Sequence, residues 1–137
     1  MSLDLDELGA WLRLLMTPGV GPLSARKLLA AFGSPQAVFD ASPAARRAVL
    51  SRDIAALSTP PDGLSEQLDL SWDWWRRGDR AERTILTLAD PRYPAALLEA
   101  ADPPLLLFAE GDLRLLHTPA VAIVGSRHAT PQGEDNA

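Results

Sequence analysis

Apolar residues recur every three or four positions at the start of the chain. Asp4 stands three residues before Glu7 in the form of a capping box, and the spacing after it predicts a helix over about 5–15. A second helix is predicted from Pro22, since proline suits the first helical position, to Gly33, since glycine suits the position after the last. The apolar positions of these helices are Leu5, Leu8, Trp11, Leu12, Leu15, Leu23, Leu28, Leu29 and Phe32. The pair is expected to form a helix-hairpin-helix.

Shorter helices are predicted next. Ser34-Pro35 and Ser42-Pro43 each combine an N-cap residue with a first-turn proline, which predicts helices over 36–40 and 44–50. A further turn is expected near 54–57. The first sixty residues are therefore expected to be all-helical.

A longer helix is predicted over 64–77, after a proline-rich break that is too short to act as an independent linker. This helix is expected to pack against the helices before it. Its apolar face holds Leu64, Leu68, Trp72 and Trp75. Trp74 points elsewhere and is expected to cover a domain junction.

The hydrophobic period changes after Gly78. Three short apolar runs predict strands at 84–88, 104–108 and 121–124, with helical turns at 95–100 and 113–117 between them. The last run, rich in β-branched residues, is expected to be a buried parallel strand. Thr130-Pro131 then predicts the start of a further helix. A parallel sheet needs more strands than these, so the sequence is expected to be the front part of a longer protein.

Composition limits the function. The chain has 137 residues, 47% of them hydrophobic, as in globular proteins, and it has no cysteine. A disulfide framework and a thiolate metal site are therefore excluded, and His117 and His128 lack companions for a metal site. No apolar run is long enough to span a membrane and the N-terminus lacks the basic region of a signal peptide, so a cytoplasmic protein is expected. The net charge of −5 argues against a protein that coats nucleic acid by charge alone, so any nucleic-acid site must be local.

Gly125, Ser126 and Arg127 form the strongest candidate site. They follow the apolar run 121–124 and precede a predicted helix, which is the arrangement of a phosphate-binding turn. Glycine allows close approach of the backbone, and the serine and arginine side chains can donate to phosphate oxygens. A plain turn between a strand and a helix is the alternative.

The turn before Pro22 is a weaker candidate. Gly19 and Gly21 could direct amide groups at the start of the second helix toward a DNA phosphate, with Arg26 and Lys27 one turn on. A tight turn between two packed helices explains the same residues and is favoured. Neither this turn nor 125–127 matches a nucleotide-binding fingerprint, no acid and base pair has a catalytic spacing, and no cofactor is indicated, so the chain is not expected to be an enzyme.

Motifs in the second half resemble the DNA processing protein A family, also called DprA or Smf, which acts in natural transformation. They occur in the family's order over about 86–137: Thr87-Leu-Ala-Asp90, Tyr93-Pro94-Ala-Ala-Leu97, Asp102-Pro-Pro104 with Leu107-Phe108, Glu110-Gly111, and Val121-Ala-Ile-Val-Gly-Ser-Arg127 with Thr130 and Gly133.

The resemblance implies an α/β protein with two domains. Residues 1–80 would form a helical SAM-like domain, and 81–137 the first strands of a Rossmann-like DNA-binding domain. Such a protein binds and protects single-stranded DNA, helps to load the RecA recombinase, and forms a homodimer. Gly125, Ser126 and Arg127 would contribute to the DNA phosphate pocket. The family's remaining DNA-contacting and dimerising elements would follow Ala137, so weak DNA binding is expected for this chain.

Two other functions stay open. The Gly-Ser-Arg opening is also similar to Rossmann enzymes that cleave nucleoside monophosphates, although the Tyr-Pro and Asp-Pro-Pro motifs argue against these. The helical half could instead be a protein-docking module. Tyr93 and the prolines around it are expected to serve structure, with one tyrosine hydroxyl to satisfy.

Overall fold

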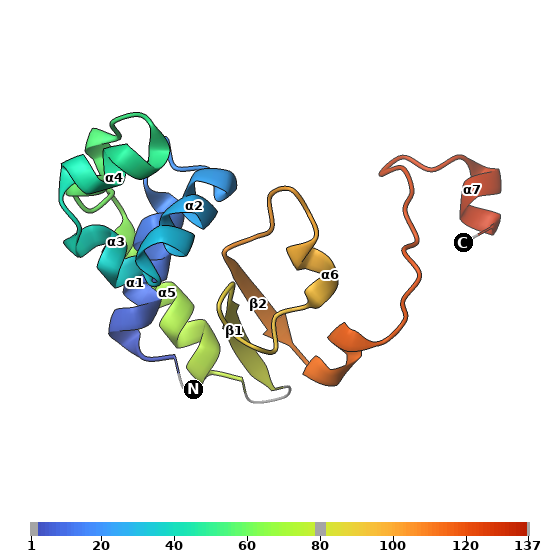
Figure 1. Cartoon of the computed structure of the whole chain (residues 1–137). Helices are drawn as coiled ribbons and strands as arrows, with labels where there is room; N and C mark the ends of the chain where they lie inside the picture. The colour runs from blue at the N-terminus through green and yellow to red at the C-terminus, as the bar shows by residue number, and fades with distance from the viewer. Residues whose placement is uncertain (1–2, 79–81, 137) are drawn as a thin grey trace.

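The computed structural model describes residues 3–78 and 82–136 (Figure 1). The first part of the chain is helical, as the sequence predicts. Its elements are α1 (Leu5–Met16), α2 (Pro22–Phe32), α3 (Pro35–Asp40), α4 (Pro43–Leu50), the 3-10 helix η1 (Ala55–Ser58) and α5 (Leu64–Arg76). The boundary expected between residues 80 and 81 lies outside the described residues.

Local capping fixes where these helices begin and end. Asp4 Oδ1 accepts a hydrogen bond from the Glu7 amide at 2.8 Å, and Ser34 and Ser42 cap α3 and α4 in the same way. Proline occupies the first turn of α2, α3 and α4. Gly33 ends α2 with a φ of 88°, a conformation that glycine adopts without strain. These predictions from the sequence are therefore confirmed.

The second part contains a two-stranded sheet. Strand β1 (Arg83–Thr87) pairs antiparallel with β2 (Leu106–Glu110), with Ile85 opposite Phe108. The short helix α6 (Ala95–Leu98) lies in the connection between them, and η2 (Leu113–His117) and α7 (Pro131–Asp135) follow. The observed fold is thus a helical helix-hairpin-helix domain followed by a small antiparallel sheet.

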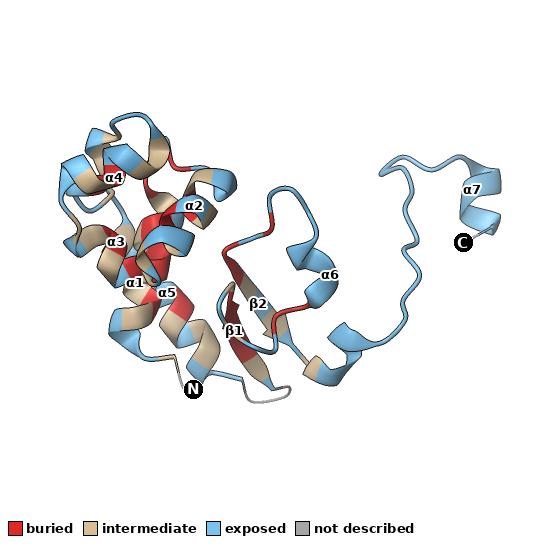
Figure 2. Ribbon diagram, viewed as in Figure 1, coloured by how far each residue is buried: buried red, intermediate tan, exposed pale blue. Residues whose placement is uncertain are grey.

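One hydrophobic core joins the helices to the sheet. Leu8 and Leu12 of α1 belong to the same buried cluster as Ile85 of β1 and Leu106 of β2, and Figure 2 shows buried residues both in α1 and in β1. Trp74 completes the junction, since its ring packs edge-on against Phe108 at 5.2 Å between centroids. The expectation that Trp74 covers a junction is confirmed.

The buried arc of the first two helices differs in part from the predicted one. Leu5, Leu15 and Leu23 are exposed, whereas Leu14 and Ala25 are fully buried. Helix α1 packs against α3 as well as α5, so its buried face is wider than one leucine stripe and extends to Leu14 in the last turn.

The predicted buried strand at 121–124 is wrong. This segment is irregular, and Val121, Ile123 and Val124 are each 90% exposed. The expected parallel pairing is also absent from the described sheet, whose two strands are antiparallel. A β-branched run becomes a strand only where a neighbour supplies backbone hydrogen bonds and a surface to bury it, and no described segment does so here.

Candidate nucleic-acid interface

The turn between α1 and α2 is held in place by two hydrogen bonds and by the burial of Val20. The Val20 amide donates to the Thr17 carbonyl at 3.2 Å, and the Thr17 hydroxyl donates to the Arg13 carbonyl at 2.6 Å. Val20 is buried in the core, and Gly19 has a φ of 82°, which a residue with a side chain rarely adopts. The turn therefore presents the N-terminus of α2 in a fixed direction.

Arg52 lies at this N-terminus and was not predicted from the sequence. Its Nη2 donates to the Gly19 carbonyl at 2.9 Å and lies 3.4 Å from the Ser24 hydroxyl. The first-turn amides of a helix have no carbonyl partner within the helix, and the helix dipole makes them attractive to anions. A guanidinium beside them adds a full positive charge. The signal in the sequence was weak, because Arg52 lies 33 residues after Gly19.

The stretch around this turn is locally basic in an acidic chain. Residues 17–52 contain one acidic residue, Asp40, and five basic ones: Arg26, Lys27, Arg46, Arg47 and Arg52. Arg46 is buried, and its guanidinium bonds to Leu57 and Ser58 rather than lying at the turn. Although the net charge is −5, the positive charges of Arg26, Lys27 and Arg52 therefore lie on α2 or at its N-terminus.

Arg26 is half-buried on α2. Its charge is near enough to the Tyr93 hydroxyl to oppose the rise in the pKa of Tyr93 that burial causes. Lys27 is exposed. Of the two basic residues predicted for this turn, Lys27 is thus the freer one.

Gly125, Ser126 and Arg127 lie in an exposed, irregular segment that leads away from the sheet (Figure 1). The Ser126 Oγ accepts a hydrogen bond from the His128 amide at 3.1 Å. Thr130 caps α7 by accepting from the Gly133 amide at 3.1 Å, which confirms the predicted helix start. The helix therefore follows the loop as expected, but the strand that should precede it is missing, and the structure does not bring this loop to the α2 turn.

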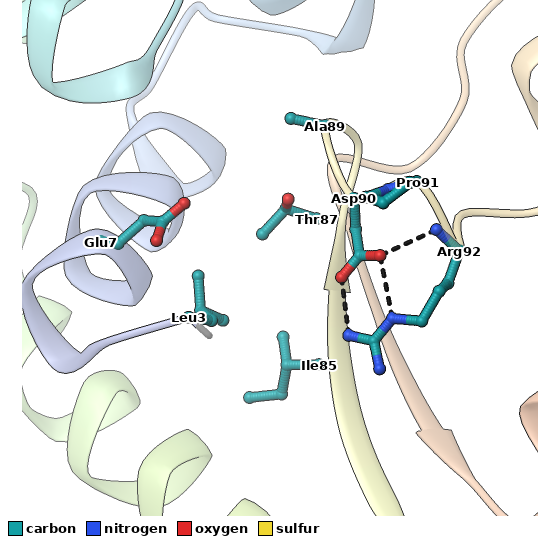
Figure 3. Close-up of a pocket in the computed structure, with 8 residues that line it drawn as sticks. All are labelled: Leu3, Glu7, Ile85, Thr87, Ala89, Asp90, Pro91 and Arg92. Carbon is teal, nitrogen blue, oxygen red and sulfur yellow. Dashed lines mark hydrogen bonds and ion pairs between the residues drawn. The ribbon is translucent and has the colours of Figure 1, made fainter. Parts of the chain in front are cut away.

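The motif residues 87–93 form a turn at the end of β1, beside a hollow of about 350 Å³ (Figure 3). The Asp90 carboxylate accepts from the Arg92 guanidinium at 2.8 and 3.0 Å and from the Arg92 amide at 2.8 Å. These bonds hold the pKa of Asp90 below its usual value. Asp90 is thus engaged in the turn and is a poor candidate for a general base.

Tyr93 joins two of the sequence motifs. Its side chain is buried, and its hydroxyl donates to the Pro104 carbonyl at 2.7 Å. The Tyr-Pro motif is therefore tied directly to the Asp-Pro-Pro motif. This confirms the expectation of a structural role with one hydroxyl to satisfy.

The described residues contain no cluster of metal-ligating side chains and no helix that could span a membrane. No group of three histidine, aspartate or glutamate residues in the described ranges could hold a metal ion. No described helix is both long enough and apolar enough to cross a bilayer.

Comparisons with known proteins separate the two parts of the chain in the same way. Residues 6–60 match the model of the DprA-like N-terminal HHH domain, and residues 84–137 match that of DNA recombination-mediator protein A. The chain belongs to the DprA family. The DNA processing protein DprA of Streptococcus pneumoniae (strain ATCC BAA-255 / R6) is 49% identical to it over 47 residues, which are 34% of this chain and 17% of that relative. No solved structure gives a significant match.

Proposed function

We propose that this DprA-family chain binds single-stranded DNA in the cytoplasm during natural transformation, protects it, and helps to load RecA as part of a homodimer. Family membership supports DNA processing as the broad function. The observation that carries the DNA-binding part is the rigid α2 turn, where Arg52 stands beside the helix N-terminus.

The α2 turn suits a phosphate group and would not distinguish one DNA sequence from another. Backbone amides and an arginine fork bind phosphate oxygens without contacting base edges. Gly19 and Gly21 shape this turn, and Lys27 extends the positive charge along α2. Gly125, Ser126 and Arg127, in the exposed loop, form a second contact with the phosphates of the same single-stranded DNA.

Fluorescence anisotropy of a labelled oligo-dT tests this function. The chain is titrated at several salt concentrations and compared with Lys27→Ala, with Arg127→Ala and with the matched control Arg77→Ala, whose exposed side chain pairs with Asp73. Each lost phosphate contact should weaken binding about 3- to 10-fold and make the slope of log K against log salt shallower by about 0.7. The control should leave both quantities unchanged.

Absence of binding at low salt would refute the DNA-binding proposal. If all three variants weaken binding equally, the chain binds DNA only by non-specific charge attraction, and the proposed contacts are refuted. RecA loading is measured separately, as the rate of RecA filament growth on coated single-stranded DNA with and without the chain. An unchanged rate would remove RecA from the proposal and leave DNA binding in place.

A further inference from the structure

Two arginines of the helical domain lie together without a carboxylate partner. Arg46 is only 6% exposed and donates to the Leu57 carbonyl at 3.1 Å and to the Ser58 hydroxyl at 3.1 Å. Arg13 donates to the same Leu57 carbonyl at 3.3 Å. Neither arginine belongs to an ion pair within the described ranges 3–78 and 82–136. Buried cations are normally paired with an anion, so two guanidiniums that share one neutral oxygen are unusual.

Arg13 is the accessible member of this pair. Its guanidinium carbon lies 4.0 Å from the centre of the Phe39 ring, which fixes the plane of the group, and its buried Nε has no hydrogen-bond partner in the described structure. Burial, and then the charge of Arg46, lower the pKa of Arg13. A negative charge placed on Arg13 would offset both effects.

A hollow of about 390 Å³ opens beside Arg13, between α1, α3 and α5. Phe39, Leu64 and Leu68 give it apolar walls, and Asp40 stands on its edge as an exposed carboxylate. A phosphate backbone carries repeated negative charge and gains little from apolar walls. A peptide with a single carboxylate beside an apolar side chain matches the one cation, Arg13, and the apolar walls, and it meets less repulsion from Asp40 than a chain of phosphates would.

We propose that this hollow is a docking site for an acidic peptide segment of a partner protein. One aspartate or glutamate of the partner binds Arg13, and a neighbouring apolar side chain packs against Leu64 and Leu68. The site uses other residues than the DNA contacts proposed above and does not depend on them.

Selection from a phage-displayed library of random peptides tests the site. The library is selected in parallel on the wild-type chain, on Arg13→Gln and on Arg47→Gln, the matched control at an exposed arginine of α4. We expect the wild type and the control to enrich sequences with an acidic residue next to a bulky apolar one, and Arg13→Gln to enrich none of them. In a synthetic peptide, replacing the acid with its amide should weaken binding at least tenfold. Asp40→Asn should tighten it at least twofold.

Circular dichroism establishes that each variant is folded. If Arg13→Gln does not fold, the amide peptide and Asp40→Asn still decide the matter, because both measurements use a chain that keeps Arg13. The proposal is overturned if no peptide is enriched, if the amide peptide binds as tightly as the acid, or if Asp40→Asn weakens binding. Displacement of the peptide by oligo-dT, with DNA binding that depends on Arg13, would assign the hollow to nucleic acid instead.

Discussion

Replacing Tyr93 with phenylalanine removes a single hydroxyl from a buried contact. The ring is 3% exposed, and the lost hydrogen bond of 2.7 Å leaves the Pro104 carbonyl without this donor. A neutral hydrogen bond contributes about 0.5–1.5 kcal/mol, and an unsatisfied buried carbonyl costs about 1–3 kcal/mol. Pro104 itself is exposed, so water can partly replace the donor. We therefore expect Tyr93→Phe to lower the free energy of unfolding by about 1 kcal/mol, with Tm falling by about 3–5 °C.

Urea denaturation followed by circular dichroism and tryptophan fluorescence measures this change. Ser126→Ala is the matched control, because it removes a hydroxyl from an exposed residue and should change stability by less than about 0.5 kcal/mol. A Tyr93→Phe variant as stable as the wild type would show that the hydroxyl contributes nothing net. The reasoning would then fail, although the contact exists.

The same residue predicts an alkaline pH dependence. Burial raises the pKa of Tyr93, with the charge of Arg26 opposing the rise. The unfolded chain then ionises first, near pH 10, so the stability of the wild type is full below that pH and falls as pH rises through the higher folded pKa. The tyrosine is the only one in the chain, so tyrosinate absorbance reports its pKa directly. Tyr93→Phe should lack this part of the alkaline loss.

Two further predictions concern the turn at the end of β1 and the exposed apolar segment. Asp90→Asn should lower the free energy of unfolding at neutral pH by about 1–2 kcal/mol, because it removes a charged hydrogen-bond acceptor. Since the pKa of Asp90 is lowered in the fold, its contribution is present above the unfolded value near 3.9 and is lost as pH falls, so the variant should have a flatter acid limb in urea titrations. Asp112→Asn, at a similar but more exposed pair, is the control, and an equal effect of both variants would contradict this account. We also expect the exposed run 121–124 and the open sheet edges to cause self-association, with Ile123→Lys reducing it in sedimentation velocity, and a wild type that stays monomeric at high concentration would contradict this.

The helical part was largely predictable because its signals act over a few residues. A cap such as Ser34 and the proline after it determine a helix start within one turn, and Gly33 ends α2 by its own conformation. The sheet was predicted as strands but not as an antiparallel pair, since pairing depends on segments that lie far apart in the sequence. The exposed state of 121–124 has the same origin, because β-branched residues favour an extended backbone but do not supply the neighbouring strand with which to pair. Arg52 and the Arg13–Arg46 pair were missed because only the folded chain brings them to their partners.

We expect the α2 turn to contribute more to DNA binding than residues 125–127, the reverse of the order that the sequence indicated. The sequence favoured 125–127 over the α2 turn, because a strand was expected to hold the loop in place. The loop is instead exposed and has no strand before it, whereas the α2 turn is anchored by Val20 in the core and carries Arg52. A preorganised site loses less conformational entropy on binding than an exposed loop does. We therefore expect Lys27→Ala to weaken oligo-dT binding more than Arg127→Ala, and the opposite order would mean that DNA itself organises the loop.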